Sequence, residues 1–440
     1  MRIHRFALCT IVFAMSIGGA ALALAKATDP VKNSTSDNIT LDQALDHAFR
    51  NRQELTAYQA DLAAAKLRLQ HAGLPPNPEL GVEWNNLGGD LPSGDSKETT
   101  ISLSQPFEIG GKASARKNKG QAEILRLQQE QAVAWLDIAA EVRTAFLEVL
   151  GTRERLALQD DAAKTASELV AITREQVAAG KLAGTEEMRA EAKKAEIAAE
   201  TQRLKRLLAD AELNLTIILA GAEKSGVTAD GLLAPEVPIP DRETLLAEMK
   251  QSPLLALRRS ETQLARTNLS LEQANAWSDP ALSLAVREVP DEDARAVAIG
   301  VSIPLPLFQR NQAAVAEAGA TAHKATANEA VAARRLQTEL IKAHTNLVAA
   351  DQEVRSLRNE GLSKATQAAE AVREGFRAGK FRYSDVLEAS QALMAIKTRY
   401  LDALLDLNRA AVSLDRLLGK PAFPAIANES SKPSSHRSTP

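Results

Sequence analysis

The longest uninterrupted feature of the sequence is the stretch from Ala113 to Gly180, which contains no proline and only two internal glycines, Gly120 and Gly151. One continuous helix over this stretch would be about 100 Å long, because each helical residue adds about 1.5 Å. Every seventh residue from Trp135 is apolar: Trp135, Val142, Val149, Leu156, Ala163, Val170 and Val177. A repeat of seven with charged residues between predicts helices that supercoil around one another. Ordinary globular helices run to about 20 residues, so the chain is expected to form long helical hairpins.

The composition fits long helices and argues against one class of partner. Only 3% of the residues are aromatic, and 53 basic residues stand against 56 acidic ones, which gives a formal net charge of -3. Nucleic-acid binding needs a basic stripe, and the sequence has none. We therefore expect no nucleic-acid partner.

Residues 1–25 have the pattern of a secretory signal peptide. Two arginines precede an apolar run from Phe6 to Ala14, and the segment ends in Ala23-Leu24-Ala25, an A-x-A site that predicts cleavage after Ala25. The alternative is an uncleaved membrane anchor. The only cysteine, Cys9, lies in the apolar run, so the mature chain is expected to have no thiol. No later stretch has the roughly 18 consecutive apolar residues of a spanning helix, so any membrane crossing would use strands.

The chain contains one unit twice. Three pairs of landmarks recur about 200 residues apart, namely Asn77-Pro78 with Asp279-Pro280, Gly180 with Gly379, and Gly221 with Gly419. A near-constant spacing predicts a duplication. We expect a first repeat at 26–221, a Gly- and Pro-rich linker at 222–240, a second repeat at 241–420, and a disordered Ser- and Pro-rich tail at 421–440.

Each repeat is expected to run helix, strand, strand, long helix, turn and long helix. Thr40 opens the first helix without a complete capping box, and this helix is expected to end near Ala72, before a proline-rich breaker. Alternating apolar and polar residues predict strands, at ~79–87, ~98–107, ~281–288 and ~294–303. The predicted helical hairpins cover ~113–220, with a tip at ~179–187, and ~311–418, with a tip at ~378–386.

The predicted strands have the length and the pattern of membrane strands. A tilted strand of about nine to eleven residues crosses a bilayer, and each strand here has one apolar face and one face of small or polar residues, as lipid and water require. One chain offers about four strands, whereas membrane barrels begin at about eight, and open edges in lipid leave backbone groups unpaired. Several copies must therefore share one barrel, and three copies would supply about twelve strands. The alternative is a soluble antiparallel sheet with one solvated face.

Three segments resemble the TolC family of outer-membrane efflux channels. They are Asn77-Pro-Glu-Leu-Gly-Val-Glu-Trp-Asn-Asn-Leu-Gly-Gly, Thr99-Thr-Ile-Ser-Leu-Ser-Gln-Pro-Phe-Glu-Ile-Gly-Gly-Lys and Ala378-Gly-Lys-Phe-Arg-Tyr-Ser-Asp-Val-Leu-Glu-Ala. The part from Gln105 to Lys112 is most similar to the heavy-metal branch of the family, the cobalt–zinc–cadmium resistance type. The resemblance covers roughly residues 40–420.

The resemblance implies a mainly α fold with a small membrane β-barrel portion: a homotrimeric α/β barrel channel in the outer membrane with a helical tunnel that reaches into the periplasm. It also implies the partners, which are outer-membrane lipid, a periplasmic adaptor (membrane fusion) protein and an inner-membrane proton-driven pump of the RND type. The channel would be passive, and it would export substrate, above all divalent heavy-metal cations.

The resemblance also places the periplasmic entrance at the hairpin tips, where acidic side chains narrow it. Carried over to this sequence, it points to Asp385 and Glu388 as gate and selectivity residues, with Glu186 at the equivalent place in the first half. Three copies of these carboxylates would form a ring that favours cations. The alternative is an ordinary helix start, where the helix dipole stabilises Asp and Glu.

Further residues of the tips have expected roles. Lys181, Lys380 and Arg382 are candidates for ion pairs that hold the tips closed. Exposed ion pairs contribute less than about 1 kcal/mol each, so a partner could open such a tip. Gly180 and Gly379 are expected to allow the chain reversal and are candidates for adaptor docking.

No pattern in the sequence predicts a resident metal, a cofactor or an enzyme. The histidines, methionines and carboxylates form no cluster with the ligand spacing of a zinc or copper site. Nucleophile, phosphate-loop and metalloprotease motifs are missing as well. We expect any exported metal to pass in water, steered by carboxylates.

Two other functions remain open. One is an outer-membrane duct for drugs or other organic compounds, or for type I protein secretion. The other, of a different class, is a soluble periplasmic adaptor or coiled-coil scaffold. Adaptors usually hold one hairpin between Gly-rich β-domains, whereas this chain has two hairpins and strands of membrane length, which disfavours the adaptor.

Overall fold

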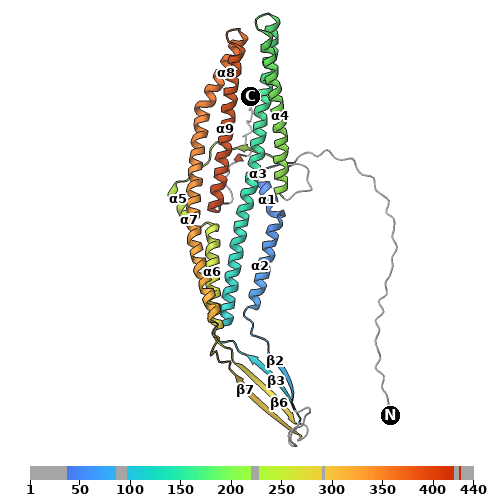
Figure 1. Cartoon of the computed structure of the whole chain (residues 1–440), viewed down its shortest axis with the longest axis vertical. Coiled ribbons are helices and arrows are strands. Elements are labelled where there is room, and N and C mark those ends of the chain that lie inside the picture. Colours follow the sequence, from blue (N-terminus) through green and yellow to red (C-terminus); the bar gives the residue numbers. More distant parts are fainter. Residues whose placement is uncertain (1–36, 86–96, 220–226, 290–292, 421–425, 428–440) are drawn as a thin grey trace, which may run out of the picture. The chain divides into compact units, whose positions relative to one another are not determined.

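A computed structural model describes residues 37–85, 97–219, 227–289, 293–420 and 426–427 of the chain (Figure 1). The predicted signal peptide 1–25, residues 86–87 at the end of the first predicted strand, and most of the predicted tail lie outside the described residues.

The same order of elements occurs twice. The first series is β1 (Asp37–Ile39), α1 (Leu41–Asn51), α2 (Gln53–His71), β2 (Glu79–Asn85), β3 (Glu98–Pro106), α3 (Lys112–Ala178) and α4 (Gly184–Ile218). Two short strands follow, β4 (Val227–Ala229) and β5 (Leu232–Leu233). The second series is α5 (Arg242–Met249), α6 (Pro253–Asn275), β6 (Ala281–Val289), β7 (Ala294–Ser302), α7 (Gln312–Ser356), the π-helical segment η2 (Leu357–Gly361), α8 (Leu362–Arg377) and α9 (Tyr383–Leu418), and β8 (Ile426–Ala427) ends the described chain.

The long helix expected from the heptad pattern is present as α3, which is continuous over 67 residues. Val142 and Val149 of the heptad line are fully buried against α1 and α4, in a core that also contains Phe146. Trp135 stacks on Phe49 of α1, with the ring centroids 4.5 Å apart. The apolar line of α3 therefore packs against its neighbouring helices as the pattern predicted.

The prediction of one helix from Thr40 to Ala72 is wrong. The chain forms two helices, because Arg52 between them is extended (φ -70, ψ 116), and its side chain pairs with Glu141 of α3. The prediction that the capping box is incomplete is also wrong, because Thr40 and Gln43 form a complete capping box at the start of α1.

Short strands form in the described parts of the linker and of the tail. β4 pairs in parallel with β1, and β5 pairs with β8, so Ile426 and Ala427 of the expected disordered tail form a short strand. Val227, Ala229 and Val237 of the linker are buried. The side chain of Arg153 in α3 donates to the carbonyl oxygens of Ala229 and Gly231 at 2.7 and 2.8 Å. Non-local pairing of this kind leaves no local pattern in a sequence.

The four longer strands form one antiparallel sheet in the order β2-β3-β6-β7 (Figure 1). The register places the apolar side chains of neighbouring strands side by side on one face, for example Val82, Ile101, Val286 and Val297. These side chains are exposed, and Leu80 and Ile299 reach 72% and 76%. The sheet thus presents an apolar face that no other part of the described chain covers.

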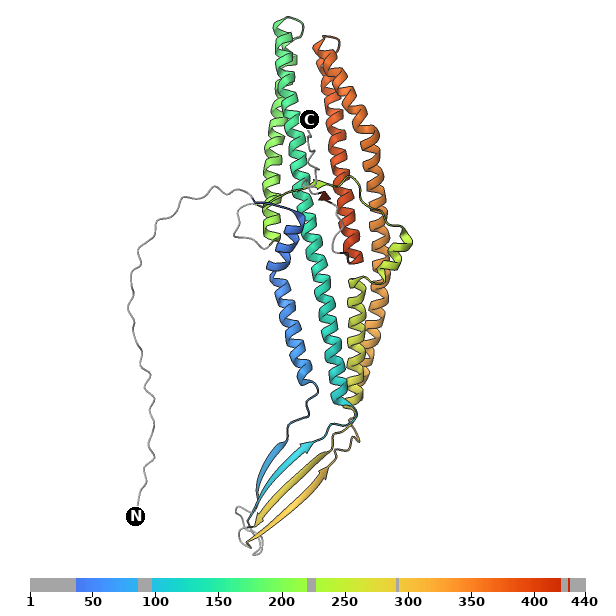
Figure 2. The same ribbon diagram turned by 180° about the vertical axis from the view of Figure 1, so that it is seen from behind.

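The helices of the two series pack lengthwise, and the sheet extends from one end of them (Figures 1 and 2). The core of the second series joins α5, α7 and α9. α3 and α9 are linked by a buried ion pair between Arg143 and Asp415, 2.8 Å apart, with side-chain exposures of 4% and 2%. Among the described residues, no helix has an apolar stretch long enough to span a membrane.

Candidate functional site

The two hairpin tips reverse the chain in the same way. Gly180 and Gly379 have φ values of +71 and +72, which favour glycine. In the first tip, Gly180 N–H donates to Val177 O and Lys181 N–H to Gln176 O, both at 2.9 Å. Gly379 and Lys380 make the same pair of hydrogen bonds in the second tip, at 2.9 and 2.8 Å. This pair of bonds is a Schellman motif.

The predicted gate carboxylates lie in the first turns after these reversals. Asp385 accepts the backbone N–H of Arg382 at 2.9 Å and so caps α9. Glu388 is exposed one turn further along α9. Glu186 holds the matching position on α4 and pairs with Arg189 at 3.0 Å. Asp385 therefore has a structural role in the cap, and the exposed Glu388 has no such role in the described chain.

The basic residues expected to hold the tips closed are Lys181, Lys380 and Arg382. None of them makes an ion pair with another described residue of the same chain. The ion pairs found near the tips involve other arginines. Arg174 bridges Glu187 and Glu191 at 2.7 and 2.8 Å and so joins α3 to α4. These two pairs tie the arms of the first hairpin together, whereas Arg377 of α8 lies 3.8 Å from Glu168 of α3 and so pairs one hairpin with the other.

A cluster of buried side chains joins the two hairpins near their tips. It contains Leu169, Val170, Ala190, Phe376, Tyr383 and Val386. Tyr383 is only 3% exposed, and its ring lies 6.3 Å from that of Phe376. Burial, and secondly the Glu186 carboxylate, raise the pKa of the Tyr383 phenol, so Glu186 of the first tip lies near the start of α9. Beside the cluster, a groove of about 1020 Å³ is lined by α3, α4, α8 and α9.

This cluster was not predicted from the sequence. A tyrosine directly after a hairpin turn is a sign of an anchored tip, because a large apolar ring at an exposed turn is otherwise unfavourable. Its partners come from a hairpin about 200 residues away, and no local pattern identifies them.

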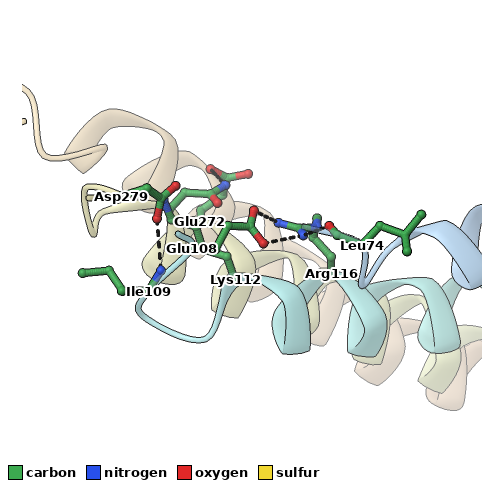
Figure 3. Close-up of polar contacts among 8 residues, drawn as sticks. Leu74, Glu108, Ile109, Lys112, Arg116, Glu272 and Asp279 are labelled. Atoms are coloured by element: carbon green, nitrogen blue, oxygen red, sulfur yellow. Dashed lines mark hydrogen bonds and ion pairs between the residues drawn. The ribbon is translucent and has the colours of Figure 1, made fainter. Parts of the chain in front are cut away.

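A second polar site lies where the sheet meets the helices (Figure 3). Asp279 accepts Ile109 N–H at 3.1 Å and the Lys112 ammonium at 2.6 Å. Arg116 binds both oxygens of Glu108, at 2.5 and 2.7 Å. Arg116 also donates to the carbonyl oxygens of Ala72 (2.8 Å) and Leu74 (3.3 Å). The site fixes the start of α3 to residues that precede β2 and β6.

Two residues of this junction stand out in the sequence, but their contact does not. Lys112 ends the motif that carries the family resemblance, and Asp279 served only as a landmark of the duplication. The ion pair between them needs the sheet to bring the halves together. Within the described parts of the chain, no group of three or more His, Cys, Asp or Glu residues is arranged to hold a metal ion.

Comparison with known proteins agrees with this architecture. The model of the family described as outer membrane efflux protein matches residues 28–221 and 250–420. The two matched ranges contain the two series of elements seen in the structure.

Two curated relatives are resistance proteins of Cupriavidus metallidurans (strain ATCC 43123 / DSM 2839 / NBRC 102507 / CH34). The cobalt-zinc-cadmium resistance protein CzcC is 32% identical over 383 residues, which cover 87% of this chain and 90% of CzcC. The nickel and cobalt resistance protein CnrC is 26% identical over 293 residues, which cover 66% of this chain and 67% of CnrC.

Solved structures share the fold. The structure of CusC, a protein described as forming a transmembrane channel, superposes with a TM-score of 0.72 at 15% identity and covers 88% of this chain and 95% of CusC. An identity this low is evidence for the fold alone. Together with the family match over most of the sequence and the similarity to CzcC, it identifies this chain as a member of the outer membrane efflux protein family, located in the outer membrane.

Proposed function

We propose that this chain is the passive outer-membrane channel of a tripartite system that exports divalent heavy-metal cations. One observation supports the proposal of a channel: the four-stranded sheet has an exposed apolar face on one side and small or polar residues on the other. Such a sheet suits lipid on one side and water on the other, and several copies are needed to close it. A homotrimer supplies about twelve strands.

The metal substrate is supported by the relatives. CzcC is a cobalt-zinc-cadmium resistance protein and CnrC a nickel and cobalt resistance protein. The channel is proposed to do no chemistry of its own: the adaptor and an inner-membrane RND-type pump deliver the cation, and the channel conducts it. Deleting the gene should lower tolerance to at least one of zinc, cobalt, cadmium, nickel and copper. Unchanged tolerance to all five, with increased sensitivity to a panel of dyes, would favour a duct for organic compounds instead.

We place the gate at the tips. Glu388 is exposed, Asp385 is half-buried, and Glu186 lies near the start of α9. Three copies of these side chains would concentrate negative charge at one level of the tunnel and favour cations. Lys181, Lys380 and Arg382 are proposed to pair with a neighbouring copy, because each is exposed and none is paired within the described residues of its own chain.

The gate is tested by removing charge and keeping shape. Asp385→Asn combined with Glu388→Gln retains a side chain able to cap α9, and the cation-to-anion permeability ratio of the purified channel in a planar bilayer should fall several-fold. The matched control is Glu339→Gln, an exposed carboxylate of α7 that lies about 60 Å from the tip along the helix. An equal permeability ratio in the double variant and the wild type would remove both residues from the gate.

Adaptor docking is proposed at the tip backbone. A Cβ atom added at Gly180, Gly184 or Gly379 would meet no atom within 4 Å, so the apex is open to a partner. Gly184 has no unusual φ, and a bulky residue there avoids backbone strain. Gly184→Trp should leave the channel folded and weaken co-purification with the adaptor, whereas undiminished co-purification would place docking elsewhere.

A further inference from the structure

Among the described residues of the four longer strands, Arg287 of β6 is the only basic residue on the polar face of the sheet. It lies opposite Thr100 of β3 and Ala296 of β7. Val286, the preceding residue, belongs to the apolar face, and successive residues of a strand point to opposite faces. The Arg287 side chain therefore projects from the polar face, where it is 55% exposed.

Arg287 has an acidic partner on the neighbouring strand. Its guanidinium lies 3.6 Å from the carboxylate of Glu98, the first residue of β3. Because Thr100 is opposite Arg287, Glu98 is a diagonal neighbour on the same face, within reach of a long side chain. The ion pair thus runs along the surface of the sheet and holds the long arginine side chain beside the strands.

The other charged side chains on the polar face of the described strands are acidic. Glu79 and Glu83 of β2 lie opposite Ser104 and Thr100, on the same face as Glu98. The polar face of one chain therefore carries three carboxylates and one guanidinium, and its charge is negative overall.

The ion pair lies toward the far end of the sheet. β2 and β6 run away from the helices, and β3 and β7 return to them (Figure 1). Glu83, Glu98 and Arg287 lie close together in the far half of their strands, and this set is called here the Arg287 level. The next row of the polar face toward the helices consists of small residues, namely Gly81, Ser102, Ala285 and Ala298.

This difference in size matters once the sheet encloses water. Long side chains narrow the interior of a closed sheet and small ones widen it. The Arg287 level is therefore narrower than the row beside it. Fixed charges act most strongly on a passing ion where the passage is narrow, so the balance of charge at this level is expected to count most.

We propose that Glu98 determines the ion selectivity of the sheet interior by neutralising Arg287, so that the carboxylate of Glu83 sets the sign of the field at the Arg287 level and favours cations. The proposal rests on the proposed function, because it assumes that copies of the sheet enclose a water-filled path. Without Glu98, the charges of Glu83 and Arg287 cancel, and the preference for cations at this level is lost.

A second ion pair on the same strands provides a matched control. Arg295 of β7 lies 2.9 Å from Glu288 of β6, and their side chains are 76% and 50% exposed. Glu288 follows Arg287 directly and lies opposite Thr99, on the apolar face. The two pairs thus have the same chemistry at nearly the same height of the sheet, but they project from opposite faces.

Reversal potentials in a gradient of potassium chloride test the proposal on the purified channel in a planar bilayer. Glu98→Gln should lower the cation-to-anion permeability ratio at least about twofold, and Arg287→Gln should raise it by a similar factor. The combination of both changes restores the net charge of the level and should return the ratio to the wild-type value. Glu288→Gln, which frees Arg295 on the apolar face, should leave the ratio unchanged.

Two results would overturn the proposal. An equal shift of the ratio in Glu98→Gln and Glu288→Gln would show that the effect does not depend on facing the interior. A lower urea midpoint of unfolding in Glu98→Gln with a wild-type ratio would show that the pair only stabilises the strands. We expect little change in the midpoint, because exposed ion pairs contribute little to stability.

Chemical modification gives a second measurement that leaves the ion pair intact. Ala296→Cys places a thiol opposite Arg287, in a background in which the only native cysteine is replaced (Cys9→Ser). A cationic methanethiosulfonate should lower the permeability ratio, and an anionic one should raise it. Val297→Cys places the thiol on the apolar face as the control, and neither reagent should change its ratio. An unchanged ratio in modified Ala296→Cys would show that this level does not border the ion path.

The outcomes separate this proposal from the proposed function. If the wild type conducts and prefers cations, but Glu98→Gln, Arg287→Gln and modified Ala296→Cys all keep its ratio, the Arg287 level does not set selectivity and the channel stands. If the wild type does not conduct in the bilayer, the proposed function itself fails.

Discussion

The two helical hairpins share the geometry of their tips and differ in their outgoing arms. In the first hairpin this arm is the uninterrupted α3. In the second it consists of α7, η2 and α8, with a π-helical segment at Leu357–Gly361. π segments are places where helices bend and where function is often found. The duplication thus preserved the Schellman turn and placed a point of local irregularity in one hairpin alone.

The return arms differ as well. α9 begins at Tyr383, which is buried against the first hairpin. α4 begins at Gly184, around which a Cβ atom would meet only open space. The second tip therefore packs against the first hairpin through the large side chain of Tyr383. The start of α4, by contrast, contributes no large side chain to this contact. The two hairpins thus contribute unequally to the contact between them, and substitutions in each hairpin measure how much stability each contribution provides.

The largest effect is expected where the two halves are joined, at Arg143 of α3 and Asp415 of α9. Arg143→Met leaves a buried carboxylate without its arginine and should lower the free energy of unfolding by about 3–5 kcal/mol. The measurement is urea unfolding of the detergent-solubilised protein. Adding Asp415→Leu should restore most of the loss, because a buried pair exchanged for apolar residues is often neutral. A loss below about 1 kcal/mol in Arg143→Met would mean that the halves are held by packing alone.

Tyr383→Ala is expected to have the next largest effect, a loss of about 3 kcal/mol, because it removes a large buried ring from the cluster between the hairpins. Hydrogen exchange should accelerate in both tips and not at the sheet. Gly184→Ala, at the start of the other return arm, is the matched control and should slow exchange slightly, since alanine favours a helix over glycine. Faster exchange in the second tip alone would show that the first hairpin does not depend on the contact.

A substitution of a glycine inside a long helix should change the stability of the protein less than the variants above, and through a more local contact. A Cβ atom at Gly151 of α3 would lie 2.6 Å from a methyl carbon of Leu405, which is itself 1% exposed. Gly151→Ala should therefore destabilise the protein by about 1–3 kcal/mol through overpacking. Combining it with Leu405→Ala should recover part of the loss, and the two changes should be clearly non-additive in the same urea measurement. Additive effects would contradict the close approach of the two helices.

How far the sequence predicts this molecule depends on the range of the interactions. The heptad line of Trp135, Val142 and Val149 predicts α3 because its period follows from the helix itself. Strict alternation locates the four strands near their observed bounds for the same reason. The break at Arg52 was not predictable, since its extended backbone accompanies a contact with Glu141 on another helix.

The residues of the candidate site also fall into two groups, those predictable from the local sequence and those whose environment depends on distant contacts. Gly180 and Gly379 were predictable, because a reversal with positive φ needs glycine. Tyr383 was not, because its burial depends on the other hairpin, and neither was the pairing of Ile426 with Leu233. The π segment was hidden for a different reason: Leu357 continues the apolar repeat of α7, so the periodic pattern gives no sign that the hydrogen bonding changes there.

The smallest expected effect concerns that segment and has the opposite sign. Gly361, at the end of η2, has space for a methyl group, since a Cβ atom would lie 3.5 Å from Ile396 and 3.6 Å from Leu357, which is ordinary contact. Gly361→Ala should thus stabilise the helix by about 0.5–1 kcal/mol, where the corresponding change in α3 is destabilising. If bending at η2 contributes to opening, the same variant should also lower the open probability of the channel in a bilayer. A stabilised protein with unchanged gating would show that η2 is an irregularity of packing, and the two outgoing arms would then differ in shape but not in role.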